Sequence, residues 1–492
     1  MEYSNFIELA ESYSIVPVYE RISADFLTPV SAYIKIRGKD RTAFLLESVE
    51  GIGRLARYSF IGAGPEEIIS NDHKELKIRT NGDVTTFPGN LFDLLKTKVA
   101  GFNHPRINDL PYFTGGLVGY IGFDNISLIE DVIEYKEESD SISPDSILGI
   151  YKTIIAFDHF KHQVIIITNV DCSDKSDLRL KYENARQEIA SYKTLLNEMS
   201  HYKSDFRARP FELTAEEEAD FLDLVETSKK NIYAGDIFQI VLSKRFEAEY
   251  EGDPFNVYRA LRMINPSPYM YFMEFENGFK VIGTSPEDLL KVKNRKAEIL
   301  PIAGTRRRGK TDDEDRMLEN ELMNDPKEIA EHVMLVDLAR NDLGRVSKLG
   351  TVKISENMKI NRFSHVMHIV SRVEGILNDE SDCIDALMAS FPAGTVSGAP
   401  KIKAIQLINK YEKIKRGLYA GAVGYIDFSG NLDMCIAIRT LFVKRNKIYW
   451  QAGAGIVADS KPELELKEIK NKSAVLVSAL KCAEVIDENT CY

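Results

Sequence analysis

The chain has 492 residues, 44% of them hydrophobic, so it is long enough for two or three average domains or for one large core. Its formal net charge of -12 argues against a nucleic-acid partner, because binding to a phosphate backbone depends on clustered Lys and Arg. The first residues lack a basic segment followed by an apolar one, and no run approaches the ~18 apolar residues that cross a membrane, so we expect a cytoplasmic small-molecule enzyme without membrane contact.

The N-terminal half consists mainly of short segments rich in β-branched residues and bounded by turn residues, which is typical of an antiparallel sheet. We predict strands at residues 31–37, 42–49, 58–62 and 75–80, and a hairpin of 150–158 with 162–170. Helices are predicted at 91–98 and 178–199. The polar stretch 201–210 ends in Pro and marks a boundary, which divides the chain into regions 1–205 and 206–492.

The C-terminal half alternates helices with strands. Thr214 and Glu217 form a capping-box pattern ahead of a helix that should end near Ala234. Strands are predicted at 236–246, 270–275, 280–284, 363–374, 419–427, 434–443 and 447–454. Several are separated by short turns, so hairpins dominate over crossovers and the fold class should be α+β.

Residues 325–344 should form a helix, with Asp325 as its cap and Gly344 at its end. Glu328 and Glu331 are three residues apart, so their carboxylates project side by side from this helix. Glu328 could instead be the carboxylate of a capping box, and Glu331 could be an ordinary solvated surface charge.

A second pair with the same spacing, Glu465 and Glu468, stands on a helix expected at 462–480. Two such pairs predict a site for a hard cation, and carboxylate ligands suit Mg²⁺. Zinc would need His or Cys, and His365 and His368 lie three apart on a predicted strand, where their rings point to opposite faces. His368 is either a core histidine or an acid or base beside the cation.

Three glycine-rich stretches, 303–305, 392–401 and 451–456, could offer backbone N–H groups to an anion, although each taken singly is more often a tight turn. None has the glycine spacing of a nucleotide-binding loop. The run 306–308 consists of three Arg residues and is most simply a solvated face. Arg439 differs, because it ends an apolar strand, where a charge needs a carboxylate partner from the protein or a substrate.

Together these stretches resemble the chorismate-binding enzymes, and within them the first component of the anthranilate synthases. The resemblance covers most of residues 214–480 and is carried, in chain order, by residues 301–305, 325–346, 365–373, 391–401 and 462–472. The N-terminal half matches more loosely, at residues 45–48, 57–62 and 115–119.

This resemblance implies an α+β fold with two facing, mainly antiparallel sheets flanked by helices. It also implies a Mg²⁺-dependent lyase that converts chorismate and ammonia into anthranilate and pyruvate, a step of tryptophan biosynthesis. No glutamine amidotransferase domain fits in the chain, so the ammonia is expected from a separate amidotransferase subunit.

The resemblance also implies roles for individual residues. Glu331 and Glu468 would hold the metal, with Glu328 and Glu465 acting directly or through bound water. Glu328 would also be the acid that protonates the departing ring hydroxyl, His368 would assist pyruvate elimination, and Thr305 would lie beside the ring. Tyr419 and Arg439 match positions that hold the enolpyruvyl carboxylate. The remaining substrate contacts would come from Gly304, Thr395, Gly453, Ala454, Gly455 and Lys472.

Two positions separate the subfamilies. Aminodeoxychorismate synthases carry a nucleophilic Lys where this chain has Ala303, which cannot attack the ring. Isochorismate and salicylate synthases carry a basic Lys where this chain has Gln239, which is too weak a base. Both differences favour ammonia addition. Aminodeoxychorismate synthase component I and a non-catalytic tryptophan-binding regulatory protein are the alternatives.

Two further segments resemble the tryptophan feedback site of the family, which makes L-tryptophan an expected inhibitor. One carries Glu47 and Ser48, and the other carries Pro268, Tyr269 and Met270. The simpler interpretation is a strand and a Pro-rich turn, which are common in any sheet protein. Feedback inhibition would require that tryptophan bind one arrangement of the two regions better than the other.

Overall fold

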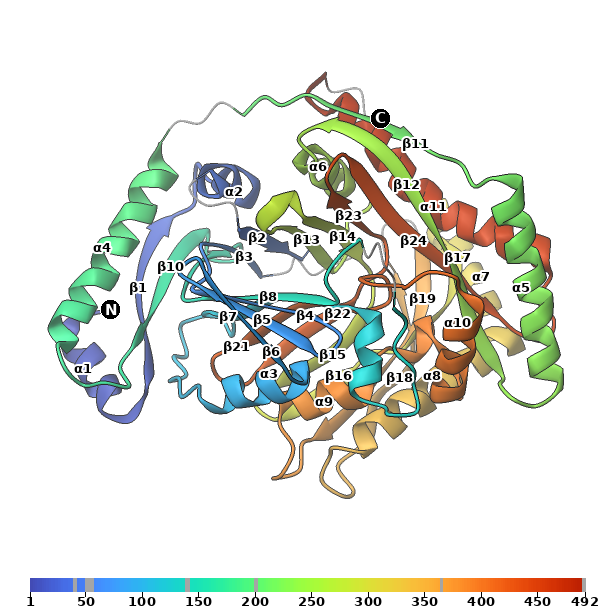
Figure 1. Cartoon of the computed structure of the whole chain (residues 1–492), viewed down its shortest axis with the longest axis horizontal. Coiled ribbons are helices and arrows are strands. Elements are labelled where there is room, and N and C mark those ends of the chain that lie inside the picture. Colours follow the sequence, from blue (N-terminus) through green and yellow to red (C-terminus); the bar gives the residue numbers. More distant parts are fainter. Residues whose placement is uncertain (39–41, 49–56, 138–141, 199–201, 363–365, 489–492) are drawn as a thin grey trace.

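Two large sheets flanked by helices make up the protein, in a computed structural model that describes residues 1–38, 42–48, 57–137, 142–198, 202–362 and 366–488 (Figure 1). Every strand pairing recorded within these ranges is antiparallel, with register shifts at a few bulges. The α+β class with two mainly antiparallel sheets is therefore confirmed. No helix in the described ranges combines the length and the apolar content needed to cross a membrane.

The first sheet contains twelve strands from both halves of the chain. In spatial order they are β1 (Ile15–Ser23), β10 (Gln163–Asp171), β9 (Thr153–Asp158), β3 (Tyr58–Ala63), β2 (Ala43–Glu47), β13 (Tyr269–Glu274), β14 (Lys280–Ser285), β23 (Thr440–Lys444), β24 (Lys447–Ile456), β12 (Gln239–Gly252) and β11 (Phe206–Pro210), with β20 (Gly398–Ala399) beside β12.

The second sheet also contains twelve strands and is likewise shared by the two halves. Its order is β17 (Ile302–Arg307), β19 (Val366–Ile376), β16 (Lys296–Ile299), β15 (Asp288–Lys293), β22 (Leu432–Ile436), β21 (Ala422–Asp427), β7 (Gly116–Ile121), β8 (Ser146–Tyr151), β4 (Glu67–Asp72), β5 (Glu75–Thr80) and β6 (Asp83–Pro88), with β18 (Lys353–Arg362) beside β19.

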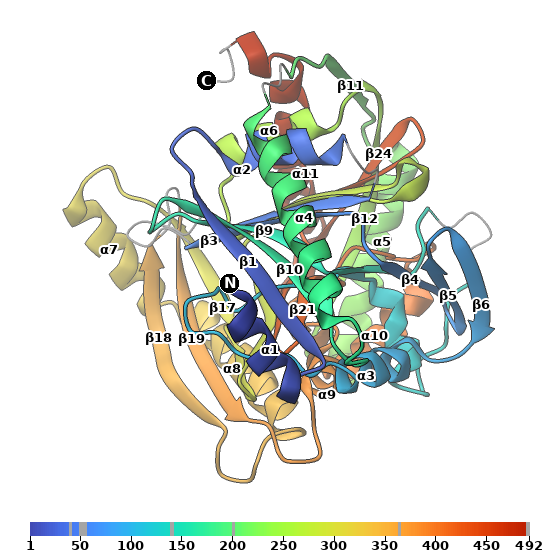
Figure 2. The same cartoon turned by 90° about the vertical axis from the view of Figure 1, so that its left-hand side faces the viewer.

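Helices cover the outer faces of both sheets. They are α1 (Tyr3–Ser12), α2 (Pro29–Arg37), α3 (Leu91–Ala100), α4 (Leu178–Asn197), α5 (Ala215–Tyr233), α6 (Phe255–Ile264), α7 (Asp312–Met323), α8 (Pro326–Gly344), α9 (Cys383–Ser390), α10 (Lys401–Tyr411) and α11 (Pro462–Glu484), with single 3₁₀ turns at Phe123–Leu128, Glu276–Gly278, Gly394–Val396 and Ile486–Glu488. α11 packs on β24, α8 on β17 and β19, and α4 on β1 and β10 (Figure 2).

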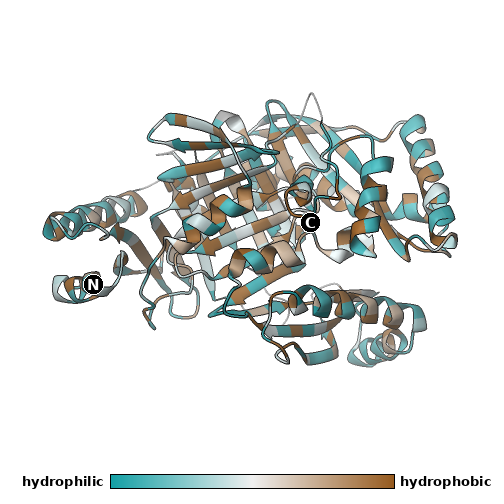
Figure 3. Ribbon diagram, turned by 60° about the horizontal axis from the view of Figure 1, so that its bottom comes forward, coloured by the Kyte–Doolittle hydropathy of each residue, from teal (hydrophilic) through white to brown (hydrophobic). Residues whose placement is uncertain are grey.

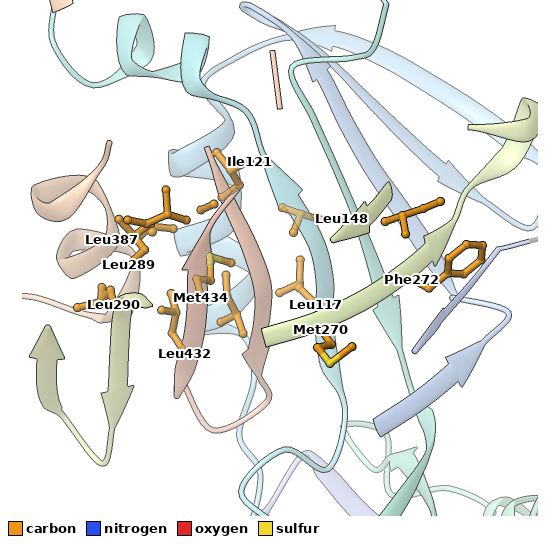
Figure 4. Packing of buried hydrophobic residues seen from close by; sticks show 14 of the residues in the cluster. Leu117, Ile121, Leu148, Met270, Phe272, Leu289, Leu290, Leu387, Leu432 and Met434 are labelled. Atoms are coloured by element: carbon orange, nitrogen blue, oxygen red, sulfur yellow. The ribbon is translucent and has the colours of Figure 1, made fainter. Parts of the chain in front are cut away.

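The hydrophobic core extends between the two sheets. Met270 and Phe272 of the first sheet and Leu117 and Leu148 of the second belong to one buried cluster (Figure 4). Hydrophobic residues concentrate on the central strands, whereas the outer helices alternate hydrophobic with hydrophilic residues (Figure 3). Burial of this shared apolar area is the main driving force that holds the sheets together.

The chain passes from one sheet to the other at several points, and two of these crossings lie next to each other. β14 leads into β15 through residues 286–287, and β22 leads into β23 through residues 437–439. The Ser285 hydroxyl donates to the carbonyl of Ile436 at 2.7 Å, and the Ile436 N–H donates to the carbonyl of Glu287 at 3.0 Å. The paired crossings therefore form a hydrogen-bonded corner between the sheets.

Three predicted strands are wrong. Residues 150–158 span the end of β8 in the second sheet and β9 in the first. Residues 31–37 form the helix α2, because Thr28 and Ser31 build a reciprocal capping box and Pro29 fixes the first helical turn. Residues 434–443 form two strands in different sheets, since the chain crosses between them at 437–439. The part of the predicted strand 363–374 before residue 366 lies outside the described residues.

Both sheets take strands from before and after residue 205, so the regions 1–205 and 206–492 share their cores. The polar stretch that marks the proposed boundary leads into β11, which pairs with β12 at the edge of the first sheet. A regulatory role for the first region and a catalytic role for the second stay predictions.

Candidate active site

Arg439 lies in the crossing between β22 and β23, where its backbone adopts a positive φ of 50°. Its carbonyl accepts a hydrogen bond from the Thr284 N–H at 3.2 Å, and its Nη1 donates to Oδ1 of Asn265 at 3.2 Å. Burial lowers the pKa of Arg439, and the nearby carboxyl of Glu287 raises it. The sequence predicted a carboxylate partner for Arg439, and Glu287 in the adjacent crossing is such a partner within electrostatic range.

Glu287 is a site residue that the sequence analysis missed. Burial raises its pKa to about 7, against partial offsets from Thr395, Lys472 and Arg439. Its side chain borders a small cavity of about 40 Å³, also lined by Thr395, Leu338 and Ala339. The available signal was its position two residues after the end of the buried strand 280–285, next to Pro286, since a charged residue at the end of a buried strand points to a site.

The edge of the second sheet brings three predicted residues together. Thr305 of β17 is paired with His368 of β19, and its hydroxyl lies 3.1 Å from Nδ1 of the ring. Gly304 has a φ of +67°, and a Cβ on it would lie 3.2 Å from Oε2 of Glu328, so only glycine fits this bulged position easily. β17 therefore passes close to α8 at the carboxylate of Glu328.

His368 has a defined ring orientation. Nδ1 lies 2.9 Å from the carbonyl oxygen of Gly304, which can only accept, so Nδ1 carries the ring proton. Burial lowers the pKa of His368, while the Gly304 carbonyl raises it and Arg439 lowers it. The neutral ring accordingly keeps its lone pair on Nε2, the form needed for a general base. His365, its suggested partner for zinc, lies outside the described residues.

Glu328 does not act as a capping-box carboxylate. The cap of α8 is Asp325 alone, whose side chain accepts from the N–H groups of Lys327 and Glu328. The carboxylate of Glu328 instead contacts Arg306, with Nη1 3.1 Å from Oε1, and Arg306 also reaches Asp325 at 2.9 Å. Arg306 is only 21% exposed, so the interpretation of the arginine run as a solvated face is wrong for this residue.

Glu331 of α8 lies within electrostatic range of Glu468 of α11. The pKa of Glu331 is raised by burial, by Glu328 and by Glu468, and that of Glu465 is raised by burial and by Glu468. These shifts show that the two helices bring their carboxylates within electrostatic range, where mutual repulsion favours a bound cation. Within the described ranges, however, no three His, Cys, Asp or Glu side chains already form a cluster able to hold a metal ion.

Two basic side chains already offset part of the negative charge that a bound metal cation would neutralise. Nζ of Lys472 lies 2.7 Å from Oε1 of Glu468 and donates to the carbonyl of Gly453 at 2.9 Å. Arg306 contacts Glu328 in the same manner. An all-oxygen carboxylate set is chemically suited to Mg²⁺, and these two cations would have to yield part of their contacts to it.

The strand β24 forms another wall of the candidate site. A Cβ on Gly453 would lie 2.5 Å from the hydroxyl of Tyr419, and a Cβ on Gly455 would lie 2.6 Å from Nε2 of Gln239, so both side chains rest against bare backbone. Tyr419 is 7% exposed, and burial raises its pKa to about 12. The neutral phenol can donate a hydrogen bond to a carboxylate. Ala454, between the two glycines, is fully buried.

The glycine-rich turn 394–398 is only partly available as an anion cradle. The N–H groups of Val396 and Ser397 bond within the turn, to the carbonyls of Ala393 and Gly394. Thr395 presents a buried hydroxyl beside the carboxyl of Glu287, without the geometry of a hydrogen bond.

The two segments that resemble a tryptophan site lie side by side. Met270 of β13 is paired with Glu47 of β2, immediately before Ser48. Glu47 is buried, accepts a hydrogen bond from the Tyr258 hydroxyl at 2.5 Å and forms an ion pair with Nε of Arg262 at 3.1 Å. Pro268 and Tyr269 precede Met270, and the Tyr269 hydroxyl donates to Asp433 of the second sheet at 2.7 Å.

The pattern that defines the chorismate binding enzyme family matches residues 42–478. Anthranilate synthase component 1 of Acetivibrio thermocellus is 43% identical over 482 residues, which is 96% of each chain, and that of Aquifex aeolicus is 42% identical over 489 residues, which is 98% of each.

Two solved structures share the fold. Anthranilate synthase component I from Streptococcus pneumoniae superposes with a TM-score of 0.73 at 37% identity, covering 93% of this chain and 99% of its own. The menaquinone-specific isochorismate synthase of Escherichia coli superposes with a TM-score of 0.72 at 19% identity, covering 97% of this chain and 98% of its own, a likeness of fold alone.

The raised pKa of Glu287 predicts a pH-dependent cost in stability. Its carboxyl binds a proton more tightly in the folded protein, so the stability that it contributes below its unfolded pKa is lost as pH rises towards about 7. Relative to Glu287→Gln, the free energy of unfolding of the wild type should fall by about 1–3 kcal/mol between about pH 5 and about pH 8. This range allows for solvent screening of the carboxyl at the cavity that it borders.

Urea unfolding of both proteins at the two pH values measures this difference. Glu8→Gln, at an exposed position of α1, is the control and should follow the wild type. Parallel pH curves for the wild type and Glu287→Gln would contradict the assignment.

Proposed function

The chain belongs to the chorismate binding enzymes, within their anthranilate synthase component 1 branch, and on this premise we propose that it converts chorismate and ammonia into anthranilate and pyruvate. The observation that carries the proposal is the convergence of Arg439, Glu287 and His368 with the glutamates of α8 and α11. Such a site can bind a dicarboxylate, donate a proton and accept one. The step would belong to tryptophan biosynthesis.

Chorismate carries two carboxylates, and the site offers opposite charge for both. Arg439 and the phenol of Tyr419 would bind the enolpyruvyl carboxylate, since both present donors at the crossing and along β24. Lys472 would add charge on the side of α11, where it already contacts the carbonyl of Gly453. Thr305, beside His368 and next to Gly304, would contact the ring.

The proposed reaction has two stages. Ammonia first adds to the ring while the ring hydroxyl leaves as water, after taking a proton from a carboxylic acid. Glu328 would supply this proton by family resemblance, and Glu287 is a second candidate, because a pKa of about 7 keeps part of it protonated near neutral pH. His368 would then remove the ring proton through Nε2 while the C–O bond between the ring and the enolpyruvyl group breaks. The released enolpyruvate takes up one proton at its methylene carbon to become pyruvate, which leaves anthranilate.

Ammonia is favoured over the other nucleophiles of the family by two residues. Ala303 carries no amine that could attack the ring, and Gln239, which rests against Gly455, cannot activate water as a lysine would. The amidotransferase subunit that would deliver ammonia is part of the proposal, and the component naming of the relatives supports a second subunit.

Mg²⁺ is proposed as the cofactor on the chemistry of the carboxylate set. Glu331 and Glu468 would hold it, with Glu328 and Glu465 as direct or water-mediated neighbours, and when bound it would supply positive charge for the substrate carboxylate and the developing negative charge. The protein's own part would be to carry these side chains on α8 and α11, with Glu331 and Glu468 within electrostatic range of each other.

L-Tryptophan is proposed as a feedback inhibitor that binds near Glu47, Ser48 and the segment Pro268–Met270. The support is spatial, because Asn265 lies three residues before Pro268, and its side chain accepts a hydrogen bond from Arg439 and donates one to Thr284 at 3.0 Å. Tryptophan bound beside β13 would therefore change the position of Arg439, which is proposed to bind the substrate.

The function is tested by supplying the purified chain with chorismate, Mg²⁺ and ammonium at mildly alkaline pH. Anthranilate fluorescence and pyruvate should appear together, whereas glutamine in place of ammonium should give product only after an amidotransferase subunit is added. Accumulation of aminodeoxychorismate or isochorismate alone would contradict the proposal. Tryptophan binding without any turnover would favour the non-catalytic regulatory protein.

Replacement of a metal-binding carboxylate should weaken Mg²⁺ binding. For Glu468→Gln we expect the Mg²⁺ affinity, measured by calorimetry, to fall by roughly one to two orders of magnitude, because neutral amides are poorer ligands and even indirect ligands have such effects. Glu463→Gln, at an exposed position in the first turn of the same helix, should bind Mg²⁺ as the wild type does. Equal affinities for both variants would remove Glu468 from the metal site.

Ser48→Phe should relieve inhibition by tryptophan while leaving turnover unchanged. The half-buried Ser48 follows β2 at the predicted site, and a phenyl ring there would fill space that the ligand needs. The inhibition curve is measured for the variant and for Thr86→Phe, an exposed position on β6 that should keep the wild-type response. Persistent inhibition of Ser48→Phe would place the tryptophan site elsewhere.

A further inference from the structure

Arg416 is a buried charge in the connection between α10 and β21, where it is 2% exposed. Its Nε and Nη2 donate to the two carboxylate oxygens of Glu412 at 2.8 and 2.7 Å. Nη1 also donates to the carbonyl of Val396 at 2.8 Å, and Nη2 to the carbonyl of Val241 at 2.7 Å. One guanidinium thus joins three segments that are far apart in the sequence.

The segments that Arg416 joins carry residues of the candidate site. Val396 follows Thr395 in the glycine-rich turn, and Val241 lies two residues after Gln239 in β12. The guanidinium carbon of Arg416 lies 5.6 Å from the centre of the Tyr419 ring, and the Tyr419 N–H donates to the Arg416 carbonyl at 3.2 Å. Arg416 therefore contacts the site from behind, without lying among the proposed substrate contacts.

The counter-ion of Arg416 is itself held firmly. Oε1 of Glu412 accepts from both the N–H and the hydroxyl of Ser243, each at 2.8 Å, and that hydroxyl accepts from Nε2 of Gln451 at 2.8 Å. A buried ion pair contributes little net stability, because desolvation offsets most of the attraction. What such a network does supply is a fixed geometry for the backbone that it contacts.

We propose that Arg416 is a positioning residue that sets the spacing of the turn 394–398, the start of β12 and the ring of Tyr419, and thereby the fit of the substrate carboxylate. This inference rests on the proposed function. A lysine could keep the charge opposite Glu412 but lacks the planar fork that reaches two further carbonyls. Arg416→Lys should therefore keep the ion pair with Glu412 but lose the contacts that position the turn 394–398 and β12.

The test compares Arg416→Lys with Lys415→Met. Lys415 is the sequence neighbour of Arg416, is 4% exposed and forms a buried ion pair, but its Nζ contacts Asp145 and Tyr135, each at 2.6 Å, away from the site segments. We expect kcat/KM for chorismate to fall by about 10- to 100-fold in Arg416→Lys, since small misplacements of binding groups have effects of this size. Lys415→Met should lower the unfolding midpoint and keep kcat/KM within about 3-fold.

The apparent KM for ammonium and the fluorescence of Trp450, the chain's single tryptophan, should stay unchanged in Arg416→Lys. A kcat/KM within about 3-fold of the wild type overturns the inference, as does an equal loss in Lys415→Met. If Arg416→Lys does not fold, the double variant Arg416→Met with Glu412→Leu removes both charges, and it should show the same loss of kcat/KM. If the wild type makes no anthranilate, the proposed function fails, and calorimetric titration with chorismate then decides the positioning role.

Discussion

The corner where β14–β15 and β22–β23 cross between the sheets is the constraint on which the rest of the structure depends. Each crossing is too short to move independently, and the bond from Ser285 to Ile436 ties one to the other inside the core. The same corner places Glu287 and Arg439 together at the boundary of the two sheets. The site is therefore built from connections between sheets, and α8, α11 and the edge strands complete it from outside.

Charge is the second organising factor of the site. Arg439 and Glu287 each have a pKa moved towards the neutral form by burial and back by the other, so each lowers the cost of burying its neighbour. Two further contacts bring opposite charges together, between Arg306 of β17 and Glu328 at 3.1 Å and between Lys472 and Glu468 of α11 at 2.7 Å. The site therefore holds Arg439, Arg306 and Lys472 among its carboxylates, and these cations suit a substrate with two carboxylates.

Much of this architecture was predictable from local sequence. The capped helices α5 and α8 and the strands at 58–63 and 75–80 follow from turn residues, caps and apolar periodicity. The pattern could not show that the apolar run 434–443 belongs to two sheets, because both of its halves are buried and β-branched. The prediction was also wrong at residues 31–37, because it followed the alternation of apolar and polar residues and not the Thr28–Ser31 cap, which starts a helix.

The glutamate pairs of the site were visible because helical spacing alone sets them side by side. Glu287, by contrast, is a single carboxylate whose importance comes from a raised pKa, and that depends on neighbours more than a hundred residues away in the sequence. The role proposed for Arg416 likewise depends on contacts with Val396 and Val241 that exist only in the folded chain. The crossing 437–439 also limits how the chain can vary in length, because Leu441 and Val443 pack in one core cluster and Phe442 in another. One added residue there would turn each of these side chains to the wrong face of its strand, so insertions have to be confined to other connections of the fold.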